Sequence, residues 1–217
     1  MKKDYTHISV ILDRTGSMEA IRNDTIGGFN AFLEQQRAEP GKATMTLVQF
    51  DSQDPYEVIH RFKTVDKVSE LNRQTYVPRA MTPLLDAIGR GINDLEENLG
   101  QLKEEEYPSK IIFVIVTDGQ ENASREFRRE QIQKMISDKS EKESWQFVFL
   151  SADLAAMGDA MSVGFTADSS LLFAKDSEGS LNAWDSLSKR TSDYRASRKS
   201  KMTFNKEDRQ HPQDPSK

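Results

Sequence analysis

Three side chains that carry oxygen alternate along the segment ILDRTGSM, residues 11–18: Asp13, Thr15 and Ser17. They follow the apolar run 8–12, which is typical of a strand buried on both faces of a parallel sheet. Open α/β sheets bind ligands at the carboxyl ends of such strands. A carboxylate and two hydroxyls are hard ligands, which suit Mg²⁺ or Mn²⁺ better than Zn²⁺. The chain contains no Cys, and no His lies at this turn.

The same three residues also have a simpler interpretation as helix caps. Residues 18–37 read as a helix, and Asp, Thr and Ser are common at the position that precedes a helix. A pattern as short as D-x-T-x-S often occurs by chance, so the triplet alone favours capping over metal binding.

Two later segments change this balance: RAMTPLLDAI, residues 79–88, and IIFVIVTDG, residues 111–119. Together with ILDRTGSM they resemble, in order and at plausible spacing, the three metal-binding loops of the von Willebrand factor A domain family. The resemblance covers roughly residues 5–173. In that family the motif D-x-[ST]-x-S, a Thr and an Asp form the metal-ion-dependent adhesion site. The matching positions here, called the metal-site residues below, are Asp13, Thr15, Ser17, Thr82 and Asp118.

The resemblance implies that these residues hold Mg²⁺ or Mn²⁺ and that an open position on the ion accepts an Asp or Glu from a partner protein. The implied function is a metal-dependent protein–protein interaction module and not an enzyme. Cytosolic bacterial and phage proteins of similar type act in stress systems or beside AAA+ ATPases, which are a candidate partner class by analogy. Two positions depart from the common pattern: Thr15 stands where Ser is commoner, and Met81 stands where a Gly often precedes the Thr.

An enzymatic alternative comes from DRTGS, which also resembles the aspartyl-phosphate loop of P-type ATPases and haloacid dehalogenases. In this alternative Asp13 is a nucleophile that is phosphorylated with the help of Mg²⁺. The phosphatase branch has a second Asp where this chain has Thr15, and the segment TDGQEN, residues 117–122, only half matches the later loop of the P-type branch. A third hypothesis is a passive scaffold with a decayed site, although all five metal-site residues keep usable oxygens.

The pattern of apolar segments predicts an α/β fold. The resemblance implies a three-layer α-β-α, Rossmann-like domain with a mostly parallel sheet and one antiparallel edge strand. The expected strands are 7–12, 43–50, 56–63, 111–117, 145–150 and 171–174, with 56–63 as the antiparallel edge. The expected helices are 17–37, 83–99, 126–142, 152–160 and 177–197. We expect a domain over 5–175, a helical extension over 176–197 and a disordered polar tail over 198–217.

Composition restricts the partner and the compartment. The formal net charge of −5 argues against general nucleic-acid binding. No run reaches the ~18 apolar residues of a membrane helix, and the N-terminal apolar run is too short for a signal peptide. We therefore expect a cytoplasmic protein without a membrane or nucleic-acid partner.

Several other polar residues have modest expected roles. Asp86 lies on the first turn of a helix, where it would favour the helix dipole. Asp51, Asp54 and Asp153 could line the rim of the site, although Asp153 is also a good helix cap. Glu121 and Asn122 would shape the loop after Asp118 without binding metal. The pair Gly27-Gly28, inside the first helix, suggests close packing against the sheet.

Overall fold

The computed structural model describes residues 2–209, which form six strands and five α-helices. The sheet has the order β3-β2-β1-β4-β5-β6. Its strands are β1 (Lys2–Asp13), β2 (Lys42–Phe50), β3 (Glu57–Thr64), β4 (Pro108–Thr117), β5 (Gln146–Ser151) and β6 (Ser170–Leu172). Only the β2–β3 pair is antiparallel among the described strand pairs. The predicted mostly parallel sheet with one antiparallel edge strand is confirmed.

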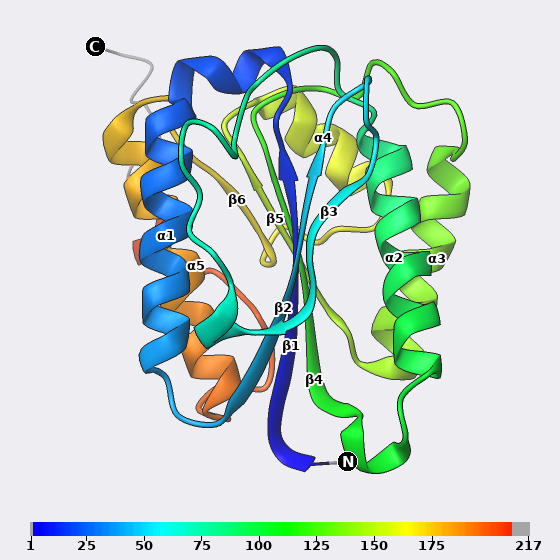
Figure 1. Ribbon diagram of the computed structural model, residues 1–217. Helices are drawn as coiled ribbons and strands as arrows, with labels where there is room; N and C mark the ends of the chain where they lie inside the picture. The colour runs from blue at the N-terminus through cyan, green and yellow to red at the C-terminus, as the bar shows by residue number, and fades with distance from the viewer. Residues whose placement is uncertain (1, 210–217) are drawn as a thin grey trace.

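The helices cover both faces of the sheet, which gives the three predicted layers. They are α1 (Arg22–Ala38), α2 (Leu84–Gly100), α3 (Arg129–Glu143), α4 (Leu154–Ser162) and α5 (Ser177–Arg195). Figure 1 shows α1 and α5 on one side of the sheet and α2 and α3 on the other. The first helix differs slightly from the prediction, because it opens with a 3₁₀ turn, η1 (Gly16–Ile21).

Strand β1 is the centre of the fold and places the candidate site. It pairs with β2 on one side and with β4 on the other, both in parallel. Alternate side chains of a strand point to opposite faces: Val10 and Leu12 belong to the apolar cluster under α1, whereas Ile11 belongs to the cluster under α2. Burial on both faces explains why the strand is almost continuously apolar up to Asp13.

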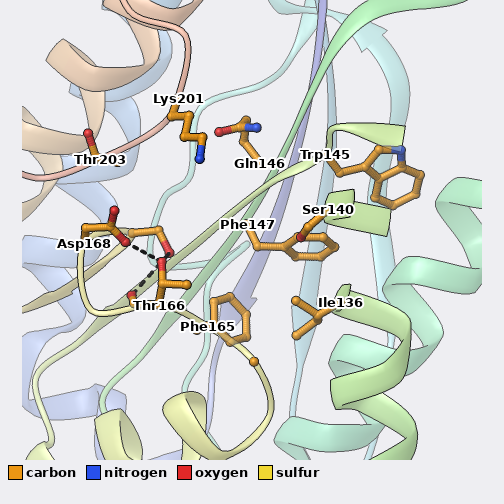
Figure 2. Close-up of a pocket in the computed structure, with 12 residues that line it drawn as sticks. Ile136, Ser140, Trp145, Gln146, Phe147, Phe165, Thr166, Asp168, Lys201 and Thr203 are labelled. Carbon is orange, nitrogen blue, oxygen red and sulfur yellow. Dashed lines mark hydrogen bonds between the residues drawn. The ribbon is translucent and has the colours of Figure 1, made fainter. Parts of the chain in front are cut away.

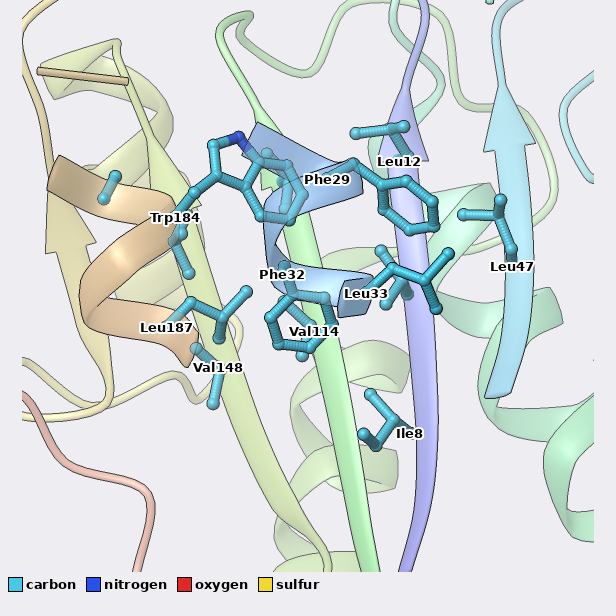
Figure 3. Close-up of a cluster of buried hydrophobic side chains, with 14 of the residues drawn as sticks. Ile8, Leu12, Phe29, Phe32, Leu33, Leu47, Val114, Val148, Trp184 and Leu187 are labelled. Carbon is cyan, nitrogen blue, oxygen red and sulfur yellow. The ribbon is translucent and has the colours of Figure 1, made fainter. Parts of the chain in front are cut away.

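A tight contact between α1 and α5 fills one of the two cores (Figure 3). The Trp184 indole of α5 packs edge-on against Phe29 of α1, with ring centroids 6.2 Å apart. A Cβ on Gly28 would lie 2.0 Å from Trp184 Cδ1, whereas a Cβ on Gly27 would meet nothing within 4 Å. The predicted close packing at this glycine pair therefore belongs to Gly28 alone, and its partner is α5 and not the sheet.

The segment after α5 differs from the expected disordered tail. Through residue 209 it lies against the domain, and Met202 and Phe204 are buried. The Met202 N–H donates to Gln146 Oε1 (3.0 Å), and the Phe204 N–H donates to the Asp168 carbonyl (2.7 Å). The prediction of disorder from residue 198 is corrected for 198–209, because two buried apolar side chains and the ion pair of Asp208 with Arg190 anchor this polar segment. Residues 210–217 lie outside the described residues.

Within residues 2–209, no helix combines the length and the apolar character needed to span a lipid bilayer.

Candidate metal centre

Three loops meet at the carboxyl edge of the sheet and bring the metal-site residues together. Asp13 ends β1 and Asp118 follows β4; these strands are adjacent and parallel, so their ends lie side by side. Thr82 comes from the loop that leads into α2. The five residues selected from the sequence thus come from three loops that are distant in the chain and adjacent in the structure.

The three hydroxyls form a connected group. Thr15 Oγ1 lies 3.2 Å from Ser17 Oγ and 3.3 Å from Thr82 Oγ1. Ser17 Oγ also donates a hydrogen bond to Asp118 Oδ1 at 2.5 Å. Thr15 and Thr82 are buried, whereas Ser17 is exposed to solvent. The group is therefore open to solvent on the Ser17 side.

Asp13 supports the loop from below and is completely buried. Its Oδ1 accepts a hydrogen bond from the Thr15 N–H (2.6 Å), and its Oδ2 accepts one from Thr117 Oγ1 (2.5 Å). Burial raises the pKa of Asp13 to about 7, although the hydrogen bonds from Thr117 and Thr15 act in the opposite direction. A carboxylate in this position favours a nearby positive charge.

Asp118 meets such a charge in Lys175, a residue that sequence reasoning did not select. Lys175 Nζ lies 2.6 Å from Asp118 Oδ2, and the Asp118 side chain is 0% exposed. The contact is an ion pair, and within residues 2–209 this buried oxygen has no hydrogen-bond partner. No sequence signal connects Lys175, in the loop before α5, to the TDG segment.

The space above Gly119 tests whether a cation fits among these groups. A Cβ on Gly119 would lie 3.1 Å from Thr82 Oγ1, 3.2 Å from Ser17 Oγ and 3.8 Å from Thr15 Oγ1. Three hydroxyl oxygens thus surround one point that no side chain fills, beside the buried Asp118 carboxylate, whose Oδ2 pairs with Lys175. An all-oxygen set of this kind fits Mg²⁺ or Mn²⁺.

Hydroxyls are essential to this assignment. In the part of the chain that the structure describes, no group of three or more His, Cys, Asp or Glu side chains is arranged to hold a metal ion. In the candidate centre, neutral hydroxyls supply three of the five side chains.

Two further residues hold the Asp13 loop, and both were missed from the sequence. Tyr76 donates its hydroxyl hydrogen to the Asp13 carbonyl (2.6 Å). Burial raises the Tyr76 pKa well above its usual value, so the phenol stays protonated and remains a donor. Thr117, which bonds Asp13 Oδ2, stands directly before Asp118 in the sequence, and this position was an available signal. Tyr76 has no comparable signal.

The Thr82 loop is tied to the segment after β4. The Thr82 N–H donates to Asn122 Oδ1 (2.8 Å), and the Asn122 N–H donates to the Thr82 carbonyl (3.1 Å). Glu121 Oε2 accepts the Leu85 N–H at the start of α2 (2.9 Å). The loop-shaping role expected of Glu121 and Asn122 agrees with these contacts.

Asp86 does more than favour a helix dipole. Its carboxylate accepts the backbone N–H groups of Arg125 (2.8 Å), Glu126 (3.0 Å) and Phe127 (3.0 Å). These bonds hold residues 125–127 in a loop, and α3 consequently begins at Arg129 and not at the predicted 126.

The expected acidic rim is only partly present. Asp51 is buried, and its Oδ2 accepts hydrogen bonds from Arg14 Nε (2.6 Å) and Arg79 Nε (2.9 Å). Burial alone would raise the pKa of Asp51, but the two arginines hold it below its usual value. Asp153 caps α4 by accepting the Ala156 N–H (2.8 Å). Asp51 is therefore removed from the predicted rim.

A separate cavity of about 220 Å³ lies near the amino end of β5 (Figure 2). Its walls include the rings of Trp145, Phe147 and Phe165, with Asp168 and Lys201 among the polar residues. None of the metal-site residues lines it. This cavity is a different feature, at the opposite edge of the sheet from the candidate centre.

Known proteins resemble this chain in three-dimensional structure but not in sequence. No protein-family model matches the sequence, and no curated protein matches it. Among solved structures, proximal thread matrix protein 1 from the mussel byssus, in a form with a zinc-occupied MIDAS motif, superposes with a TM-score of 0.58 at 14% identity. That match covers 87% of this chain and 46% of the mussel protein, so the chain spans less than half of that protein's length.

Two further structures share the fold. A von Willebrand factor type A protein from Catenulispora acidiphila has a TM-score of 0.56 at 10% identity, over 87% of this chain and 43% of that chain. The manganese-loaded TRAP protein of Plasmodium vivax has a TM-score of 0.53 at 11% identity, over 82% of this chain and 72% of that chain. The order of strands, the two helical layers and these structural matches together show that the chain has the fold of the von Willebrand factor A domain.

Proposed function

We propose that this chain is a metal-dependent protein-interaction module that binds one Mg²⁺ or Mn²⁺ through its metal-site residues. The observation that carries the proposal is the convergence of the Thr15, Ser17 and Thr82 hydroxyls over Gly119. Asp13 and Asp118 support the site from the ends of two adjacent strands. The cytosolic setting, which is expected from the composition, is a further part of the proposal. The bacterial or phage origin and an AAA+ ATPase as partner are also parts of it and follow from the resemblance.

The charge of the site explains why a carboxylate is the expected ligand. Hydroxyls are neutral, so a bound divalent cation retains positive charge. An Asp or Glu of the partner can neutralise this charge and complete the coordination shell. Ser17 is the exposed member of the group, which places the approach of the partner on its side. Asp118, whose side chain is fully buried, is not accessible to the partner.

The position of Asp13 supports binding and not phosphotransfer. Both of its carboxylate oxygens accept hydrogen bonds, one from the Thr15 N–H and one from Thr117 Oγ1. The side chain is 0% exposed. A nucleophile must reach the phosphorus of its substrate, and an enclosed carboxylate of this kind first has to lose both contacts.

The surface beside Thr82 indicates what the partner has around its carboxylate. Met81 is 52% exposed, and the Arg79 side chain is 42% exposed while it pairs with buried Asp51. The rim beside Thr82 is therefore apolar and partly basic. We propose a partner that presents one Asp or Glu beside an apolar residue.

The test is a pull-down with the purified chain as bait, performed with Mg²⁺ and with EDTA, with Thr82→Val beside wild type. Partner proteins held by wild type in Mg²⁺ and released by EDTA are the expected result, with weaker capture by the variant. The Thr82 backbone bonds to Asn122 do not need its hydroxyl, so the variant should fold. Binding that is indifferent to EDTA would reject a metal-mediated contact.

Catalysis is tested separately. Incubation with ATP, acetyl phosphate and p-nitrophenyl phosphate in Mg²⁺ should give no hydrolysis and no phosphorylated Asp13. A Mg²⁺-dependent rate that Asp13→Asn abolishes would favour the phosphotransfer enzyme instead.

A further inference from the structure

Lys175 reaches the candidate metal centre from a part of the chain that carries none of the metal-site residues. It lies between β6 and α5, and its Nζ is 2.6 Å from Asp118 Oδ2. The other oxygen, Asp118 Oδ1, accepts the Ser17 hydroxyl hydrogen at 2.5 Å. The buried carboxylate is thus held between a cation on one side and a hydroxyl on the other.

The backbone that carries Lys175 is anchored on both sides. Before it, the Phe173 N–H donates to the last carbonyl of β5 (3.0 Å). After it, Asp176 caps α5 by accepting the Gly179 N–H (2.8 Å). Gly179 is packed so closely on this segment that a Cβ there would lie 2.3 Å from the Ala174 carbonyl oxygen. The position from which the lysine reaches Asp118 is therefore fixed by the fold.

The side chain itself is free to leave. It is 38% exposed, and a lysine carries its charge at the end of a flexible four-carbon stem. A divalent cation held by the nearby hydroxyls would bring like charge close to Nζ, and like charges at short range repel strongly when they are partly desolvated. The ammonium and the metal cannot both stay close to Asp118 without a loss of affinity.

We propose that Lys175 is a tethered cation that competes with the divalent metal for Asp118 and thereby sets the free-metal concentration at which the site fills. This inference rests on the proposed metal-binding function. In the metal-free protein the ammonium neutralises Asp118. Metal binding displaces the ammonium into solvent, and the anchored backbone keeps it close enough to return when the metal leaves.

Calorimetric titration of Mg²⁺ and of Mn²⁺ into wild type, Lys175→Met and Lys175→Arg tests the proposal. The matched control is Lys189→Met, since Lys189 pairs with Asp185 on the surface of α5 and its side chain is 61% exposed. We expect the Kd of Lys175→Met to fall about tenfold, a typical coupling between two bound groups. Lys175→Arg and Lys189→Met should remain near wild type.

Thermal unfolding provides a readout that separates competition from a purely structural role. Without metal, Lys175→Met should have a lower Tm than wild type, because buried Asp118 loses its counter-charge. With saturating Mg²⁺ the variant should recover to the wild-type Tm or above it, since the ion replaces the ammonium. A Tm deficit of equal size with and without metal would overturn the competition.

The outcomes distinguish this inference from the proposed function. Equal metal affinity in wild type and Lys175→Met overturns the role of Lys175 and leaves the metal site intact. No metal binding in any of these proteins rejects the proposed function and this inference with it. If Lys175→Met does not fold, NMR of the lysine side-chain amines in the wild-type protein decides: displacement requires one ammonium signal to shift on addition of Mg²⁺, and an unchanged spectrum in a metal-bound protein contradicts it.

Discussion

Ser17 and Asp118 are 101 residues apart in the chain and meet through a hydrogen bond of 2.5 Å from Ser17 Oγ to Asp118 Oδ1. The bond joins the loop after β1 to the loop after β4, across two adjacent strands. It also orients the Ser17 hydroxyl hydrogen toward the carboxylate, which leaves the lone pairs of Oγ available to a cation. The relationship connects the fold of the sheet directly to the proposed chemistry.

Filling the space above Gly119 should abolish metal binding with little change in the fold. In Gly119→Ala the new Cβ would lie 3.1–3.2 Å from the Thr82 and Ser17 hydroxyl oxygens and would crowd these two expected ligands of the ion. Calorimetry should detect no Mg²⁺ binding, while the free energy of unfolding changes by less than about 1 kcal/mol. Gly158→Ala is the matched control, because a Cβ at Gly158 meets nothing within 4 Å. Wild-type metal affinity in Gly119→Ala would place the cation elsewhere.

Two adjacent glycines of α1 should respond in opposite directions to the same substitution. Gly28→Ala would drive a Cβ into the Trp184 indole and should lower the free energy of unfolding by roughly 1–3 kcal/mol, as overpacking does. In Gly27→Ala the new Cβ has no neighbour within 4 Å. This substitution should raise the free energy of unfolding by up to about 1 kcal/mol, because alanine favours a helix interior. Urea denaturation of the two variants measures both changes. Equal effects would mean that α1 and α5 do not pack as described.

Anchoring of the segment after α5 can be tested at Phe204, which is 6% exposed. Phe204→Ala should lower the free energy of unfolding by about 3 kcal/mol, as for other buried aromatic side chains. Leu181→Ala is the control, because Leu181 lies on the neighbouring helix α5 and is 52% exposed. Equal stability of Phe204→Ala and wild type would restore the prediction that this segment is a disordered tail.

His7 should make the stability of the domain depend on pH. The ring is fully buried, lies 3.8 Å from the Phe62 ring between centroids, and burial lowers the His7 pKa to about 3. The unfolded chain takes up this proton below about pH 6.5 and the folded chain does not. The contribution of His7 to stability is therefore full above pH 6.5 and falls as the pH decreases, by roughly 2 kcal/mol at pH 5. The raised pKa of Asp13 acts in the opposite direction over the same range.

The measurement is urea denaturation between pH 7 and pH 5 for wild type and His7→Gln, in which the side chain does not titrate. Between pH 7 and pH 5 the free energy of unfolding of the variant should fall less than that of wild type, or rise more, whatever its absolute value. His60→Gln is a useful control, because His60 lies on edge strand β3 and is only partly buried. An unchanged slope in His7→Gln would show that His7 does not cause the acid sensitivity.

The sheet and the metal-site residues could be predicted from the sequence because strands and loop motifs are both recognised from short segments. Apolar runs that end in Asp13 and Asp118 indicate strands and their carboxyl ends, and the loop motifs around them are short and contiguous. The contacts that were missed are long-range. Tyr76 reaches the Asp13 carbonyl across 63 positions, and Lys175 reaches Asp118, which follows β4, from the loop after β6, two strands away in the sheet. Neither residue type nor spacing indicates such contacts.

The same limit explains the misjudged C-terminal segment. Residues 198–209 are mostly polar, and only Met202 and Phe204 are buried hydrophobic residues there. The low apolar content of this segment predicted disorder. In the structure its two apolar side chains join the buried cluster that includes residues of β6 and α5. Whether so few contacts order a segment depends on the surface that receives them.

The central claim is that the five metal-site residues bind a divalent cation, and calorimetric titration of Mg²⁺ and Mn²⁺ into wild type and Ser17→Ala tests it most directly. Ser137→Ala, on the exposed face of α3, controls for the loss of a serine hydroxyl. We expect one ion per chain for wild type and Ser137→Ala, and binding weakened beyond detection or by at least about tenfold for Ser17→Ala. Equal affinity in all three proteins, or no binding to wild type, would contradict the account.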